Sequence, residues 1–166
     1  MADAVDAILA QWRRERPDLD VSPMGVIGRI SRAQQLLHRE LKEFFAARGL
    51  ENWEFDVLAT LRRTGAPYEL TAGGLLRTAM VTSGAITNRI DRLEAKGLVE
   101  RVRDAGDRRS VRIRLTPRGL EVVDEVVGLH AANEARLLAG LDAAGRERLA
   151  AALRTLLESL GDTSFD

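Results

Sequence analysis

A short alternating segment at residues 98–115, with helical patterns on both sides, restricts the fold more than any other part of the chain. Its second arm, residues 111–115, places apolar side chains on one side and Arg112 and Arg114 on the other, while the first arm, 98–103, alternates less regularly. Alternation with a period of two around a charged, glycine-containing tip predicts a β-hairpin. The chain therefore contains one small antiparallel element in a mainly helical fold.

Two short helices are predicted directly before this hairpin, at 71–78 and 83–96. Ser83 can cap the second helix and Gly97 can end it. The apolar stripe of the second helix consists of Ile86, Ile90 and Leu93. Two successive helices joined by a short turn indicate a helix-turn-helix, and the hairpin that follows has the position of a wing.

Helical patterns fill the rest of the chain. We predict a mainly α-helical, α+β fold, a winged helix-turn-helix with a helical dimerisation region, in a single domain over 1–166. Its expected parts are an extra N-terminal helix at 3–16, dimerisation helices at 24–48 and 117–160, and a DNA-binding module at 51–116. The terminal helices carry more apolar surface than the central module can cover, which favours an intertwined homodimer.

The formal net charge of zero hides a basic centre. Residues 60–118 contain thirteen Lys and Arg against six Asp and Glu, a net charge of +7, so the remainder carries −7. A basic module between acidic arms is typical of a protein that meets a polyanion. Chance clustering of solvated arginines remains the alternative on charge alone.

Composition also limits the chemistry. The chain has no cysteine and only two histidines, His38 and His130, which favours neither a metal site nor a disulfide. Without a catalytic constellation or a phosphate-binding glycine loop, we expect no enzyme activity, no catalytic residues and no cofactor. No long apolar run or signal-peptide pattern is present, so we expect a cytoplasmic protein with no membrane segment.

The second helix of the helix-turn-helix presents a slim polar face opposite its apolar stripe. Asn can pair with adenine in the major groove and Arg with guanine or phosphate, while arginines at a wing tip can enter the minor groove. Taken alone, this helix face equally fits an ordinary solvated surface; the wing shifts the balance towards double-stranded DNA. The predicted DNA-binding residues are Ser83, Gly84, Thr87, Asn88, Arg92, Asp107, Arg108 and Arg109.

Three segments carry a specific resemblance: Leu93-Glu-Ala-Lys-Gly-Leu-Val99, then 104–110, and finally Val111-Arg-Ile-Arg-Leu-Thr-Pro-Arg-Gly119. Together they resemble the MarR family of bacterial transcriptional regulators. The resemblance implies a winged helix-turn-helix dimer that usually represses transcription by occupying a pseudo-palindromic operator.

The N-terminal part resembles the urate-responsive branch of that family, which has an extra N-terminal helix. The matching features are Trp12, the segment Arg16-Pro-Asp-Leu-Asp20, Ser22-Pro-Met24 and Gly28-Arg29. The branch implies a ligand site for urate or a related purine. Its residues here would be Trp12, Asp56, Arg63 and Arg89.

The residues agree with that implication in part. Asp56 and Arg63 lie within about 20° of each other on one helix, and Arg89 lies on a flank of its helix rather than on the outward face. An indole and guanidinium groups suit a planar anion, which would compete with Asp56 for an arginine. Three alternatives remain open: an Asp–Arg pair with no ligand, an effector-independent architectural protein, and a regulator that answers a non-purine organic anion.

Overall fold

A computed structural model describes residues 2–78, 86–103 and 111–163. The chain divides into two compact units, Met1–Glu43 and Phe44–Asp166. The helices are α1 (Ala4–Glu15), α2 (Ser22–Ala46), α3 (Asn52–Arg63), α4 (Ala72–Thr78), α5 (Ile86–Ala95), α6 (Pro117–Leu137) and α7 (Ala143–Ser159), and the strands are β1 (Glu69–Thr71), β2 (Val99–Arg103) and β3 (Val111–Leu115).

The N-terminal unit begins with the predicted extra helix, α1. Asp3 caps it, because its carboxylate accepts the backbone N–H groups of Val5 and Asp6, and the Asp6 carboxylate accepts the N–H of Asp3 at 2.9 Å. This reciprocal capping satisfies backbone donors that a helix start leaves without partners. The helix ends at Glu15, two residues before Pro17.

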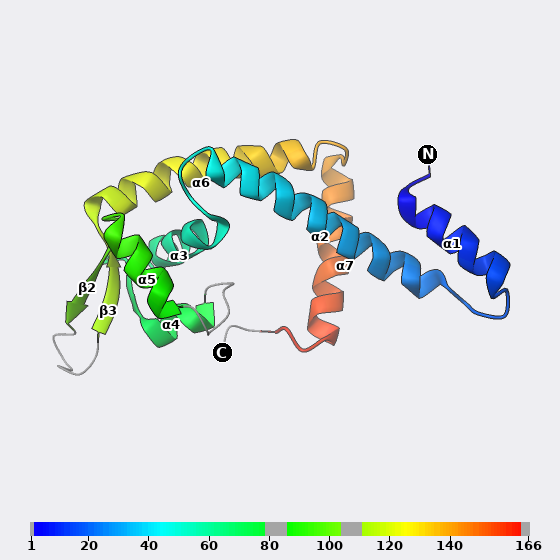
Figure 1. Cartoon of the computed structure of the whole chain (residues 1–166), viewed down its shortest axis with the longest axis horizontal. Helices are drawn as coiled ribbons and strands as arrows, with labels where there is room; N and C mark the ends of the chain where they lie inside the picture. Colours follow the sequence, from blue (N-terminus) through cyan, green and yellow to red (C-terminus); the bar gives the residue numbers. More distant parts are fainter. Residues whose placement is uncertain (1, 79–85, 104–110, 164–166) are drawn as a thin grey trace. The chain divides into compact units, whose positions relative to one another are not determined.

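Helix α1 packs against the first turns of α2 (Figure 1). Val5, Leu9 and Val21 form a small buried cluster between them. Gly25 permits this approach, since a Cβ there would lie 3.0 Å from a Leu9 methyl group. Arg29 joins the two helices by donating to the carboxylates of Asp3 at 2.8 Å and Asp6 at 2.6 Å.

The second unit contains a three-stranded antiparallel sheet in the order β1-β3-β2. The predicted hairpin is confirmed: Ile113 and Leu115 are buried, whereas Arg112 and Arg114 are partly exposed. Strand β1 was not predicted, because three residues after Pro67 are too few to show a period of two. It pairs Glu69 with Arg114 across the sheet.

Helix α3 lies at the centre of the second unit and packs on α6 and α4. Val57, Leu58 and Leu61 form its apolar stripe and are fully buried. The helix-turn-helix is confirmed as α4 and α5. The core of this unit is completed by Leu75, Ile90, Leu93, Leu98, Val99, Ile113, Leu115, Val123 and Val126.

The region predicted as helical at 117–160 consists of two helices, α6 and α7, joined by a turn at 138–142 (Figure 1). No residue of α7 is buried, and its apolar side chains Leu149, Leu153 and Leu157 remain exposed. Within the described ranges, no helix is long and apolar enough to cross a membrane.

The start of α6 is held unusually close to the start of the wing. Thr116 caps α6 by accepting the N–H of Gly119 at 2.9 Å, and its hydroxyl donates to the carbonyl of Gly97 at 2.7 Å. A Cβ on Gly119 would lie only 1.9 Å from the carbonyl oxygen of Leu98. Only glycine fits at position 119 in this packing.

We therefore expect Gly119→Ala to destabilise the protein by about 2 kcal/mol or more, because backbone atoms of Leu98 must move. Gly128→Ala in the same helix is the matched control, since no described atom outside its own helix backbone lies within 4 Å of a Cβ there. The control should be neutral or stabilise the helix by about 0.5–1 kcal/mol. Urea unfolding of both variants measures the difference, and equal midpoints would contradict the close approach.

Candidate nucleic-acid interface

Helices α4 and α5 form the part of the molecule expected to meet DNA. The hydroxyl of Thr71 accepts the N–H of Gly74 at 3.0 Å and so caps the start of α4. The stripe of Ile86, Ile90 and Leu93 holds α5 on the core. This packing leaves Asn88 exposed on the opposite side of α5, as the sequence predicts, and Thr87 exposed on a flank.

The remaining predicted DNA-binding residues divide into two groups. Arg92 is described and exposed, but its guanidinium contacts other residues of the protein. The others lie outside the described residues: Ser83, Gly84, Asp107, Arg108 and Arg109.

Arg92 belongs to a set of side chains between α3 and α5, here named the Trp53 cluster: Glu51, Trp53, Arg89 and Arg92. The Trp53 indole donates from Nε1 to Glu51 Oε2 at 2.7 Å, and Arg92 donates from Nη2 to Glu51 Oε1. The guanidinium carbons of Arg92 and Arg89 lie 5.0 and 5.3 Å from the centre of a Trp53 ring. Both distances suit a cation–π contact.

These donors lower the pKa of the Glu51 carboxyl, the Trp53 N–H first and Arg92 second. A carboxyl with a lowered pKa in the folded state adds stability at pH values above its unfolded pKa. That contribution is lost as the pH falls through the folded pKa. The Trp53 cluster is therefore held by an ionised Glu51 at neutral pH.

A buried ion pair lies next to the Trp53 cluster. The side chain of Glu54 is fully buried, and its Oε2 accepts from Lys96 Nζ at 2.6 Å and from the N–H of Glu51 at 2.9 Å. Lys96 also donates to the carbonyl of Gly49 at 3.0 Å. The last turn of α5 is thereby fixed to the first turn of α3.

Several other cations of the module are already neutralised. Arg101 donates to Asp91 at 2.5 Å and also to Glu94, and Arg114 pairs with Glu69 at 2.7 Å. In the part of the chain that the structure describes, Arg77 on α4 and Arg103 at the end of β2 are exposed cations without an ion-pair partner. Much of the basic charge seen in the sequence is thus used inside the protein.

The four residues predicted to bind a ligand lie on three helices. Asp56 and Arg63 share α3, as predicted; Asp56 is half-buried, and Arg63 donates to the carbonyl of Thr78 at 2.5 Å. Arg89 of α5 is half-buried against Trp53. Its Nη1 is buried and has no hydrogen-bond partner among the described residues. Trp12 is exposed on α1, in the other unit.

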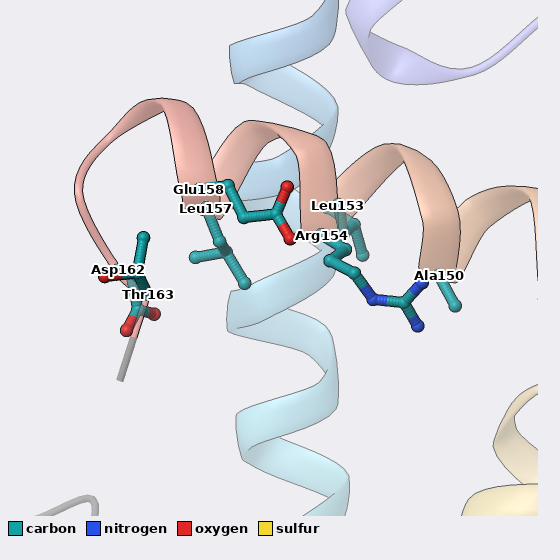
Figure 2. A pocket seen from close by; sticks show the side chains of 7 residues that line it. All are labelled: Ala150, Leu153, Arg154, Leu157, Glu158, Asp162 and Thr163. Carbon is teal, nitrogen blue, oxygen red and sulfur yellow. The ribbon is translucent and has the colours of Figure 1, made fainter. Parts of the chain in front are cut away.

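A hollow of about 630 Å³ lies along α7 and the residues that follow it (Figure 2). It is lined by Leu153 and Leu157 together with Arg154, Glu158 and Asp162. None of the four residues predicted to bind a ligand lines it. Its exposed leucines belong to the apolar surface of the predicted dimerisation region.

Comparisons with known proteins agree with this geometry. The model of the MarR family matches residues 48–110. The transcriptional regulator PecS of Dickeya dadantii is 46% identical over 134 residues, which cover 81% of each chain.

Solved structures show the same fold. BpsR of Bordetella bronchiseptica, described as regulated in DNA binding by 6-hydroxynicotinic acid, has a TM-score of 0.69 and 26% identity over 84% of this chain and 94% of its own. A variant of Escherichia coli MarR in complex with operator DNA has a TM-score of 0.71 and 27% identity over 82% of this chain and 95% of its own.

The fold and the exposed face of α5 define a DNA-binding transcriptional regulator of the winged helix-turn-helix class. The chain belongs to the MarR family.

Sequence reasoning missed the residues that fasten α5 to α3. Trp53 has the helical spacing of Val57, Leu58 and Leu61 and is therefore predicted to belong to an apolar stripe, and the sequence assigns no role to Glu51, Glu54 or Lys96. A signal was available: Glu51 and Glu54 stand at the start of one helix, while Arg89, Arg92 and Lys96 recur on one flank of the other. The sequence could not show that the start of the first helix contacts this flank of the second.

We expect Lys96→Met to destabilise the protein by about 2–4 kcal/mol, because it leaves the buried Glu54 carboxylate without its cation. Adding Glu54→Gln should recover part of that loss, since the double variant buries no charge. Arg118→Met, which removes an exposed cation without an ion-pair partner among the described residues, should change stability by less than about 0.5 kcal/mol. Urea unfolding tests all three, and a Lys96→Met variant as stable as Arg118→Met would contradict the role of the pair.

Proposed function

We propose that the protein is a homodimeric repressor that occupies a pseudo-palindromic operator and is released by a small anionic ligand, urate or a related purine. The observation that carries the ligand response is the buried Nη1 of Arg89, a cationic donor with no hydrogen-bond partner among the described residues, on the helix that faces DNA. A buried donor of this kind is costly unless a ligand or water satisfies it.

On the DNA side, α5 enters the major groove and the wing reaches the adjoining minor groove. Asn88 faces the bases, because it is exposed and opposite the buried stripe, and Thr87, exposed on a flank near the start of α5, adds a phosphate or base contact. Arg77 and Arg103 add phosphate contacts, being exposed cations whose charge no described residue neutralises. Ser83, Gly84, Asp107, Arg108 and Arg109 keep the DNA-binding roles that the sequence predicts.

The dimer is supported by apolar side chains left uncovered on the helices at both ends of the chain. In α2, Val26 and Ile27 are 58% exposed, and in α7 Leu153 and Leu157 are exposed as well. Exposed apolar surface of this extent marks a protein–protein interface. Two copies of α5 would then read two half-sites about one helical turn apart.

For the ligand, Arg89 supplies charge and paired hydrogen bonds, and Arg63 and Trp12 complete the site with a second guanidinium and a stacking ring. Asp56 competes with the anion for an arginine, so ligand binding pulls on α5 and lowers operator affinity.

A second candidate ligand is a non-purine aromatic anion. BpsR, with 26% identity, is described as regulated by 6-hydroxynicotinic acid, which makes similar demands on two arginines. The third candidate function is that of a DNA-binding protein without an effector. This function does not explain the buried Nη1 of Arg89.

For the DNA contacts, we expect Arg109→Ala to weaken binding to all duplexes and to reduce the salt slope by about 1, as loss of a phosphate or minor-groove contact would. Asn88→Ala should instead change base preference at one position of each half-site. Fluorescence anisotropy on duplexes selected from random sequence measures both, and the stoichiometry should be two chains per duplex. Wild-type affinity and preference in both variants would refute the groove assignments.

For the ligand, we expect urate to weaken operator binding by the wild-type protein, and Arg89→Ala to reduce that response at least about tenfold. Trp12→Phe keeps the stacking ring and should retain most of it, while Trp12→Ala should not. Parallel titrations with xanthine and 6-hydroxynicotinic acid separate the two ligand classes. Operator affinity unchanged at millimolar concentrations of all three compounds would leave the effector-independent reading.

A further inference from the structure

We propose that Arg92 is a positioning residue, which holds α5 against the start of α3 through Glu51 and Trp53, rather than a residue that contacts DNA. This replaces the role that the sequence alone suggests for it. The proposal rests on operator binding by α5, and the binding of the wild-type protein to its selected duplex tests that premise separately.

The geometry commits the Arg92 guanidinium to the protein. Its Nη2 donates to Glu51 Oε1, and its planar group lies 5.0 Å from the centre of a Trp53 ring. The other oxygen of the same carboxylate accepts the Trp53 indole N–H at 2.7 Å. Glu51 therefore orients the ring and the guanidinium together, because each of its oxygens accepts one of these two donors.

Arg92 is also one of three cations on the same flank of α5. Arg89, Arg92 and Lys96 fall within about 60° of one another around the helix axis. All three contact residues 49–54, Arg89 and Arg92 through Trp53 and Lys96 through Glu54 and Gly49. This flank is the surface by which α5 is fixed, and Asn88 lies outside it.

Fixing α5 matters for reading bases, because side-chain to base pairs require placement to within about 0.5 Å and 10–20°. Lys96 holds the chain directly after Ala95, at the end of α5, and the Trp53 cluster holds the middle and the last turn of α5 through Arg89 and Arg92. Without Arg92 the helix keeps only the contacts of Lys96 and the single cation–π contact of Arg89 on this flank. Asn88 and Thr87 would then meet the groove in a less defined orientation.

The two roles of Arg92 predict opposite effects of Glu51→Gln. If Arg92 contacted phosphate, removing the Glu51 charge would free its guanidinium and reduce repulsion of DNA, so binding would tighten. If Arg92 positions α5, the same change weakens the bond between residue 51 and the Arg92 guanidinium, and operator affinity falls. The sign of the effect therefore separates the roles.

The experiment measures affinity for the selected duplex by fluorescence anisotropy at fixed salt, using the full chain. We expect Glu51→Gln to bind about 3–5-fold more weakly and Arg92→Glu at least about tenfold more weakly. The charge-swapped double variant, Glu51→Arg with Arg92→Glu, should bind more tightly than Arg92→Glu alone, because it restores an ion pair, but should stay weaker than wild type, because the Trp53 N–H loses its acceptor. Glu100→Gln is the matched control, an exposed acid of β2 outside the Trp53 cluster, and should not weaken binding.

Two further readings distinguish positioning from folding. The thermal unfolding midpoint of Glu51→Gln should stay near wild type, since exposed ion pairs contribute little to stability. In a Trp12→Phe background Trp53 is the remaining tryptophan, and its emission should shift when Glu51→Gln weakens its N–H bond. Tighter binding by Glu51→Gln, or a double variant as weak as Arg92→Glu alone, would overturn the proposal.

Discussion

The fully buried carboxylate of Glu54 is the constraint on which the placement of α5 depends. A buried charge must be paired, and one oxygen of Glu54 meets this requirement with Lys96, directly after α5, and a backbone N–H at the start of α3. The last turn of α5 cannot leave that position without exposing an unpaired charge. Helix α3 thus contributes to the core of the module and also fixes α5, the helix proposed to face DNA.

The elements with a strong internal pattern could be predicted from the sequence, and the contacts between elements could not. The hairpin at 98–115 and the stripe of Ile86, Ile90 and Leu93 follow from periodicity alone, because burial of one face imposes it. Strand β1 was missed, since three residues carry no period. It exists because Glu69 and Thr71 pair with β3, a contact over more than forty residues of chain.

The candidate site shows the same division. Helical spacing correctly places Asn88 outward and Arg89 on a flank, since both follow from the angle to the buried stripe. It could not show that Arg92 meets Glu51, because the partner lies on another helix and its position depends on how α3 and α5 cross. Counting charges likewise overstated the cations available to DNA, since Arg101 and Arg114 are neutralised by acids of neighbouring elements.

The contact of Gly119 with Leu98 has a mechanical consequence. The first turn of α6 touches the backbone at the base of the wing directly, with no side chain between them that could change rotamer and absorb a displacement. Helix α6 continues at its other end into the turn before α7. A tilt of α6 therefore displaces the backbone at the start of β2 directly. In a dimer formed through α6 and α7, the relative orientation of the two subunits would therefore determine the distance between the two wings.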